Sequence, residues 1–227
     1  AQYESIKPEI DAAMDAVLAE TSFIGGPHVK AFEEAFARYC GVDHCVGVAN
    51  GTDAIFLALK TLGIGPGDEV ITVANSFVAT SEAITMAGAQ VVFADINAET
   101  MNIDVDQVER KITSKTKAII PVHLYGQPAD MAPIRALADA HGLRIIGDAA
   151  QAHGALYRGQ PVATLADITC YSFYPGKNLG AYGDAGALVT NNAEWATRAR
   201  MLANHGRTRK YDHDFEGVNS RLDGLQA

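Results

Sequence analysis

Two stretches of this chain decide its fold: Arg144-Ile-Ile-Gly-Asp148 and Ile168-Thr-Cys-Tyr-Ser172-Phe-Tyr-Pro-Gly-Lys177. Each begins with a short apolar run rich in β-branched residues, which is typical of strands covered on both faces of a sheet. Each run then ends in a polar residue, Asp148 in the first and Ser172 in the second. The two stretches therefore predict buried strands that carry polar side chains at their carboxyl ends.

Similar strands alternate with helices along most of the chain. We expect strands over residues 45–49, 69–74, 90–94, 118–122, 144–147, 168–172 and 185–190, and helices over 3–19, 29–39, 52–62, 78–87, 105–112, 131–141 and 193–202. This alternation predicts an α/β domain with a largely parallel sheet. The last two strands have no helix between them, which predicts one antiparallel member. Residues 207–216 are predicted to be a mobile surface loop, and residues 222–227 to open a helix.

Composition and charge exclude several classes of protein. The chain has 227 residues, is 48% hydrophobic and carries a net charge of -9, which argues against bulk nucleic-acid binding. No stretch approaches the roughly 20 apolar residues of a membrane span, and no signal peptide is evident. The seven histidines have no metal-ligand spacing. Three cysteines without a CxxC pair suggest reduced thiols, so we expect a cytoplasmic protein without a metal site.

Lys177 and Asp148 together suggest a specific chemistry. A lysine amine can form a Schiff base with the aldehyde of pyridoxal 5'-phosphate, and an aspartate can keep the pyridine nitrogen of that cofactor protonated. Ligands of open α/β sheets bind beyond the carboxyl ends of strands, where Asp148 is expected. The alternatives are that Asp148 caps the following turn and that Lys177 is a solvated surface charge.

Two further segments fit the same cofactor. Asn50-Gly51-Thr52-Asp53 follows a strand and opens a helix, whose free N–H groups and dipole attract phosphate. The alternative there is that Thr52 or Asp53 is an ordinary N-cap. Phe77 follows another strand and could lie on a flat cofactor ring, or be a packed core residue. His153 could contact substrate, although a single histidine of this kind is more often structural.

A family resemblance rests on several segments in a fixed order. They are residues 50–53, 65–70, 75–80, 148–151, 172–177 and 217–221, together with Gly88, Ala89 and Asp95. In these segments the chain resembles the DegT/DnrJ/EryC/StrS-type sugar aminotransferases. The resemblance implies an aspartate aminotransferase-like fold (PLP fold type I), in which residues 1–227 form the PLP-binding large domain with an N-terminal helical segment, Tyr3–Ala19. A smaller C-terminal domain is then expected to be missing after Ala227.

The resemblance also implies roles for individual residues. Lys177 looks like the Schiff-base lysine and proton carrier, and Asp148 like the partner of the pyridine nitrogen. Gln151 would contact the hydroxyl side of the ring and Phe77 would stack on it. The cofactor phosphate would be held by Gly51, Thr52, Asp53 and Ser172. Asn219 is similar to an asparagine that reaches the partner's cofactor across a homodimer interface, so the active sites would be shared.

The substrate class implied is a keto-deoxysugar attached to a nucleotide. Residues 173–186 resemble the branch that acts at the 3-position, commonly on a dTDP-3-keto-6-deoxyhexose. L-glutamate would donate the amine and leave pyridoxamine 5'-phosphate as an intermediate. Family members that dehydrate sugars have histidine in place of this lysine, so Lys177 favours transamination. The alternatives are a non-catalytic regulatory or binding protein that retains the fold and, less favoured, a lyase or desulfurase.

Overall fold

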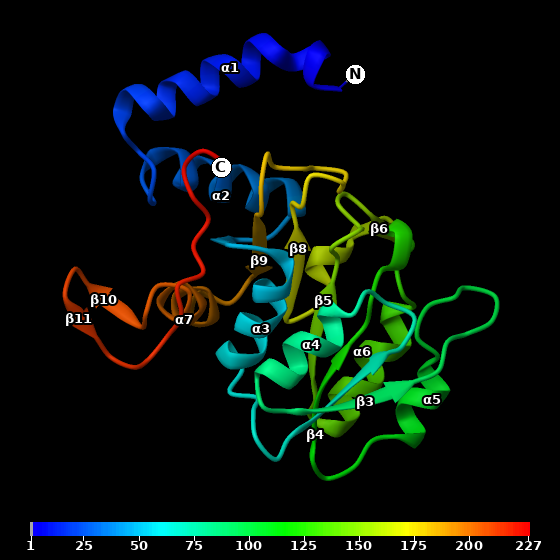
Figure 1. Ribbon diagram of the computed structural model, residues 1–227. Helices are drawn as coiled ribbons and strands as arrows, with labels where there is room; N and C mark the ends of the chain where they lie inside the picture. The colour runs from blue at the N-terminus through cyan, green and yellow to red at the C-terminus, as the bar shows by residue number, and fades with distance from the viewer. Residues whose placement is uncertain (1) are drawn as a thin grey trace.

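A seven-stranded sheet lies at the centre of the computed structural model, which describes residues 2–227 (Figure 1). The strands follow the order β1-β9-β8-β5-β4-β2-β3. Their bounds are β1 His44–Val48, β2 Glu69–Val73, β3 Gln90–Ala94, β4 Thr116–Ile120, β5 Arg144–Asp148, β8 Ile168–Ser172 and β9 Gly186–Thr190. β9 runs antiparallel to both of its neighbours, whereas the other neighbouring strands pair in parallel. The predicted mixed, mostly parallel sheet is confirmed.

Helices cover both faces of this sheet. One face packs against α3 Gly51–Thr61, α4 Ala79–Met86 and α7 Ala193–Leu202, and the other against α2 Pro27–Cys40, α5 Val105–Arg110 and α6 Met131–His141. Consecutive strand residues such as Ile119 and Ile120 are fully buried but belong to apolar clusters on opposite faces. Side chains alternate along a strand, so burial on both faces requires a continuous apolar run.

The sequence predicted the long elements closely and missed the short ones. Strands 90–94 and 168–172 and helices 131–141 and 193–202 have the predicted bounds. The surface loop expected over residues 207–216 is instead an exposed antiparallel ribbon of β10 Arg207–Arg209 and β11 Asp212–His213. A second ribbon, β6 Leu156–Tyr157 with β7 Gln160–Pro161, was not predicted, because two-residue strands are too short to show a period.

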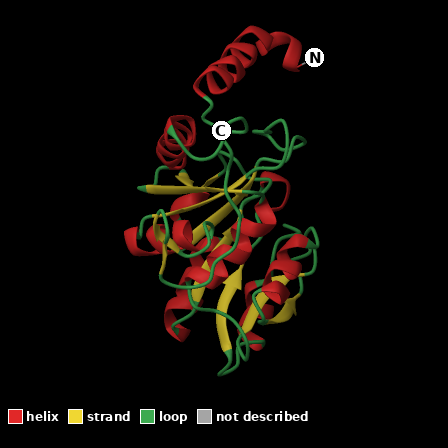
Figure 2. Ribbon diagram, turned by 60° about the vertical axis from the view of Figure 1, so that its left-hand side comes forward, coloured by secondary structure: helices red, strands yellow, loops and turns green. Residues whose placement is uncertain are grey.

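Segments near the two ends of the chain pair outside the central sheet. α1 Gln2–Glu20 confirms the predicted N-terminal helix and stands apart from the sheet and its covering helices (Figure 2). Ile24 forms an isolated antiparallel bridge with Asp223. The last residues form a hydrogen-bonded turn, in which the Asp223 carboxylate accepts from the Gln226 N–H at 2.8 Å. Within residues 2–227, no helix is both long and apolar enough to span a membrane.

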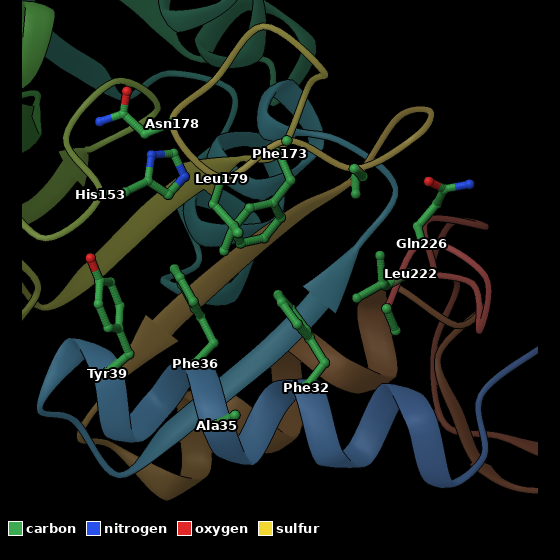
Figure 3. Close-up of a pocket in the computed structure, with 14 residues that line it drawn as sticks. Phe32, Ala35, Phe36, Tyr39, His153, Phe173, Asn178, Leu179, Leu222 and Gln226 are labelled. Atoms are coloured by element: carbon green, nitrogen blue, oxygen red, sulfur yellow. The ribbon is translucent and has the colours of Figure 1, made fainter. Parts of the chain in front are cut away.

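Aromatic side chains of α2 fix the position of β8. Phe32 and Phe36 point from the helix towards the sheet (Figure 3). The Phe36 ring meets Tyr171 and Phe173 edge-on, with centroids 5.0 Å apart in both pairs. Each such pair stabilises packing by about 0.5–1.5 kcal/mol beyond its buried area. The contacts hold the carboxyl end of β8, which leads into the segment of Lys177.

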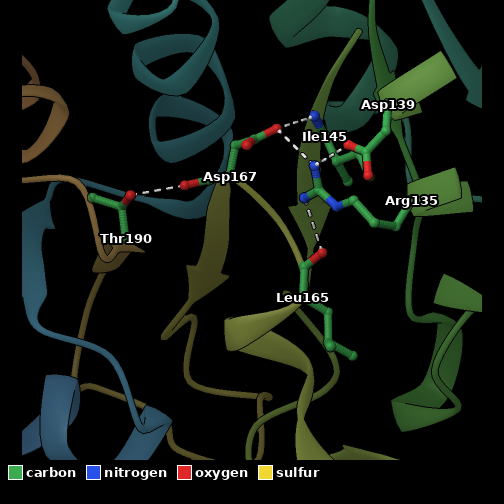
Figure 4. Close-up of polar contacts among 6 residues, drawn as sticks. All are labelled: Arg135, Asp139, Ile145, Leu165, Asp167 and Thr190. Atoms are coloured by element: carbon green, nitrogen blue, oxygen red, sulfur yellow. Dashed lines mark hydrogen bonds and ion pairs between the residues drawn. The ribbon is translucent and has the colours of Figure 1, made fainter. Parts of the chain in front are cut away.

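A polar cluster anchors the amino ends of both β5 and β8 (Figure 4). The Asp167 carboxylate accepts from the Ile145 N–H at 2.6 Å, and the Thr190 hydroxyl donates to the Asp167 carbonyl at 2.7 Å. Arg135 of α6 donates to the Leu165 carbonyl at 3.2 Å and lies 3.7 Å from the Asp167 carboxylate. These bonds set the register of both strands at the end remote from Asp148 and Ser172.

A buried glutamate joins α2, β1 and α7. Glu33 is only 8% exposed, and one of its side-chain oxygens accepts from the Gly47 N–H and from Arg200, both at 2.8 Å. A second nitrogen of Arg200 donates to the Cys45 carbonyl at 3.1 Å. Glu33 therefore supplies a side-chain acceptor for a strand N–H of β1.

We expect Glu33→Ala to lower the free energy of unfolding by about 2–3 kcal/mol, because it removes the side-chain acceptor of the buried Gly47 N–H. Glu34→Ala on the same helix is the matched control. Its exposed pair with Lys30 is 3.8 Å long, and pairs of this kind contribute about 1 kcal/mol at most. Urea unfolding measures both variants, and equal losses would contradict the assignment.

Candidate active site

Asp148 lies at the carboxyl end of β5 with its side chain only 6% exposed. One carboxylate oxygen accepts from the Thr80 hydroxyl at 2.7 Å, and the other from the Ala150 N–H at 3.1 Å. The expected turn cap is therefore present, but it occupies only one oxygen. Burial raises the pKa of Asp148, while the Thr80 and Ala150 hydrogen bonds and the charge of Lys177 lower it. Each oxygen keeps a lone pair that can accept a further hydrogen bond.

Lys177 sits in a tightly folded loop after β8. Its N–H donates to the Tyr174 carbonyl at 2.8 Å, and the Ala181 N–H donates to the Phe173 carbonyl at 2.7 Å. A Cβ on Gly180 would lie 2.6 Å from the Pro175 carbonyl oxygen, so this loop requires glycine there. The Lys177 side chain is partly buried, and its amine makes no hydrogen bond or ion pair with any described residue. Its charge acts on Asp148 and lowers the pKa of that group.

The start of α3 lies against the end of β8. A Cβ on Gly51 would stand 2.6 Å from the Cβ of Ser172, so glycine permits this close approach. The N-cap of α3 is Asn50, whose side-chain oxygen accepts from the Asp53 N–H at 2.8 Å. The alternative that Thr52 or Asp53 is the cap is therefore wrong. The N-terminus of α3 therefore lies beside Ser172, and the free N–H groups of a helix N-terminus suit an anion.

Asp53 is engaged by the C-terminal part of the same chain. The Ser220 hydroxyl, fully buried, donates to the Asp53 carboxylate at 2.7 Å and accepts from the Ala49 N–H at 3.3 Å. Sequence patterns gave no sign of this bond, which spans 167 residues. The neighbouring Asn219 is exposed and forms an isolated bridge with Asn204. Its predicted reach into a partner subunit stays a prediction.

Phe77 is not a core residue, because its side chain is 72% exposed. It follows β2 and precedes α4, in the same segment as Thr80, whose hydroxyl reaches Asp148. The alternative of a packed core phenylalanine is therefore wrong. An aromatic ring left in solvent, in the segment whose Thr80 reaches the buried carboxylate, can cover the face of a flat ligand.

Gln151 is oriented by a loop that the sequence did not single out. Its side-chain oxygen accepts from the Tyr125 N–H at 2.8 Å, so its amide N–H groups are turned away from that bond. Tyr125 has a φ of 54°, which is unusual for a residue other than glycine. The same loop is held by His123, whose Nδ1 accepts from the Ala129 N–H at 3.1 Å. In its neutral form His123 therefore carries its proton on Nε2.

The three cysteines are buried, and His153 packs among aromatic rings. His153 packs against Tyr171 and Phe173, with ring centroids 5.3 and 5.6 Å apart, and lines a pocket of about 680 Å³ beside α2. Burial lowers the pKa of His153 and raises that of the Cys40 thiol to about 11. Burial also raises the pKa of Cys45 and Cys170. Protonated, buried thiols are poor nucleophiles, which argues against a desulfurase.

We expect Gly51→Ala to lower the free energy of unfolding by about 1–3 kcal/mol, because the new Cβ overlaps Ser172. Adding Ser172→Gly to the same protein removes the overlapped atom and should restore most of the loss. Urea unfolding of the two single variants and the double variant measures this coupling. Strictly additive losses would contradict the close approach.

His123 should make stability depend on pH. Burial lowers the pKa of His123 to about 4 from its ordinary value of 6.5. Between these values the unfolded chain binds a proton that the folded chain refuses, so this contribution to stability is complete above pH 6.5 and declines as the pH falls towards 4. The decline amounts to ~3 kcal/mol. His123→Asn keeps an acceptor for the Ala129 N–H and should remove this dependence in unfolding curves measured from pH 7 to pH 4.

Known proteins resemble this chain over its whole length. A curated relative, dTDP-3-amino-3,4,6-trideoxy-alpha-D-glucose transaminase of Streptomyces venezuelae, is 50% identical over 227 residues, or 100% of this chain and 60% of that protein. Pleiotropic regulatory protein of Geobacillus stearothermophilus is 53% identical over 226 residues, or 100% of this chain and 61% of that protein. The chain thus spans about 60% of the length of these curated relatives.

A solved structure carries the same fold. The crystal structure of S. venezuelae DesV in complex with a ketimine intermediate matches with a TM-score of 0.98 and 49% identity, covering 100% of this chain and 61% of that one. The expected aspartate aminotransferase-like fold is thereby confirmed. The model of the DegT/DnrJ/EryC1/StrS aminotransferase family matches residues 4–227. With its fold and sequence both matched over nearly every residue, the chain belongs to the DegT/DnrJ/EryC1/StrS aminotransferase family.

Proposed function

We propose that the protein to which this chain belongs is a pyridoxal-phosphate-dependent transaminase. Its substrate is a keto-deoxysugar attached to a nucleotide, and L-glutamate is the amino donor. The observation that carries the proposal is the placement of Lys177 near Asp148, at the carboxyl ends of neighbouring strands β8 and β5. The family and the relatives of about 50% identity support it.

The residues at these strand ends fit the cofactor. The glycine at position 51 leaves room beside Ser172, where helix N–H groups and hydroxyls can bind a phosphate. Asp148 is buried and has lone pairs left for a ring nitrogen. Phe77 is exposed in the segment that carries Thr80, and Gln151 has amide donors to offer to a ring hydroxyl. We therefore assign these residues, with Thr52 and Asp53, to the cofactor.

Each residue has a defined task in this proposal. When bound, the cofactor supplies an electron-accepting ring that stabilises negative charge on a substrate carbon. Asp148 holds a proton on the ring nitrogen. The Lys177 amine, which makes no hydrogen bond or ion pair among residues 2–227, takes a proton from the amino donor and returns one to the acceptor, and so serves as base and acid in turn. Phe77 and the α3 terminus keep the ring in place.

The sugar and the reacting position that we propose are more specific than membership of the family. Curated relatives include transaminases named for dTDP-3-amino sugars, one of them at 50% identity. Residues 173–186 support the 3-position branch, and we assign a dTDP-3-keto-6-deoxyhexose as the acceptor. We also propose a homodimer in which the exposed Asn219 contacts the partner's cofactor phosphate.

A non-catalytic regulatory protein on the same fold is the second candidate, because one relative at 53% identity is named a pleiotropic regulatory protein. Such a protein has no need for an unpaired lysine beside a buried aspartate. The two candidates therefore differ in whether Lys177 forms a covalent bond with the cofactor and whether an amino donor breaks it.

We expect the chain mixed with pyridoxal phosphate to absorb visible light, and Lys177→Ala to abolish the band. L-glutamate should bleach the band of the unsubstituted protein. Lys30→Ala is the matched control, since its side chain is 78% exposed on α2. Borohydride reduction followed by mass spectrometry of peptides places the cofactor on Lys177. Cofactor on several lysines alike would refute the assignment, and a band indifferent to glutamate would favour the regulatory candidate.

A further inference from the structure

A chain of hydroxyl groups leads to the buried carboxylate of Asp148. The Thr80 hydroxyl lies 2.7 Å from one oxygen of Asp148, and the Ser76 hydroxyl lies 2.7 Å from that of Thr80. Thr80 is 2% exposed and Asp148 is 6% exposed, whereas Ser76 is partly exposed at the outer end. Neither hydroxyl belongs to the residues assigned to the cofactor above.

The chemistry of the Asp148 carboxylate decides which hydroxyl donates in each of these hydrogen bonds. An ionised carboxylate can only accept hydrogen bonds, so the Thr80 O–H must donate to Asp148. The Thr80 oxygen is then an acceptor, and the Ser76 O–H donates to it. Hydrogen bonds arranged head to tail polarise one another, so Ser76 strengthens the bond that Thr80 makes.

The surroundings of Asp148 give this bond its importance. Burial disfavours the charged form of the carboxylate, and the groups that favour it are Thr80, the Ala150 N–H and Lys177. Cys170 on β8 also lies close, because it is the register partner of Asp148 in the sheet. Lys177 is the group that must react, so its charge is not constant through a catalytic cycle. Thr80 and Ala150 remain as fixed donors.

We propose that Thr80, backed by Ser76, is a positioning residue for Asp148. The hydroxyl chain fixes the rotamer of the carboxylate, keeps it ionised, and directs its free lone pairs to the ring nitrogen of the cofactor. Only the contact of Asp148 with the ring nitrogen rests on the proposed function. The chain also ties β5 to the segment that carries Phe77, so the two residues assigned to the ring move together.

The test uses the 227-residue protein without added cofactor. The pKa of Asp148 is measured by carbon NMR of aspartate-labelled protein, with Asp148→Asn to assign the signal. Thr80→Val replaces the hydroxyl with a methyl of similar size, and we expect it to raise the pKa of Asp148 by about one unit. Thr80→Ser keeps the donor and should leave the pKa within a few tenths of a unit of the original.

A double-mutant cycle tests the role of Ser76. Ser76→Ala should raise the pKa of Asp148 by less than Thr80→Val does, and should have no further effect once Thr80 is valine. If Thr80→Val left the pKa of Asp148 unchanged, the proposal would be overturned. If Ser76→Ala had the same effect on this pKa with threonine and with valine at position 80, Ser76 would not act through Thr80. Thermal unfolding followed by circular dichroism checks that each variant is folded. If Thr80→Val does not fold, Ser76→Ala decides alone: a raised pKa of Asp148 supports the proposal, and an unchanged pKa overturns it.

A second measurement separates this proposal from the proposed function. Thr80→Val should weaken pyridoxal phosphate binding about tenfold, and Thr80→Ser should not. If the unsubstituted chain does not bind the cofactor, the proposed function fails, while the titration of Asp148 still decides the role of Thr80. If the cofactor binds all variants equally although the pKa shifts, the link to the ring nitrogen is wrong.

Discussion

The carboxylate of Asp148 is withdrawn from water at the end of a parallel strand, and hydrogen bonds at its side chain and main chain offset the cost of that burial. Its side chain accepts from Thr80 and Ala150. Its backbone N–H donates to the Pro121 carbonyl at 2.9 Å, and its carbonyl accepts from the His123 N–H at 2.9 Å. These main-chain bonds extend the pairing of β5 with the segment after β4 as far as Asp148 itself.

The geometry of the sheet gathers the rest of the site around this charge. Parallel strands end at the same edge, and the loops after β2, β5 and β8 all leave from it. Phe77, Gln151 and Lys177 lie on these three loops, and the α3 terminus lies against the end of β8 through Gly51. The remote ends of β5 and β8 are anchored by Asp167. The strands thus act as rigid supports for side chains distant in sequence.

Local signals predicted most of this arrangement. Apolar runs covered on both faces indicated the strands, and amphipathic spacing with a terminal glycine indicated α2, which Gly41 ends in a left-handed conformation. The position of Lys177 and Asp148 after such strands followed from the same reasoning. Two-residue ribbons could not be predicted in this way. Thr80 was missed as well, because a threonine in the first turn of a helix has many local explanations and nothing in the sequence relates it to a residue 68 positions later.

The sequence by itself determined the alternating α/β order, the strand ends that carry polar residues, and the family whose motifs they form. Those properties depend on local periodicity and residue type, which a linear chain displays directly. Only the tertiary structure decided which polar groups meet: Ser220 with Asp53, Tyr125 with Gln151, and Ser76 with Thr80 and Asp148. Hydrogen bonds act over about 3 Å, so these pairings arise only when packing of the helices on the sheet brings distant segments together.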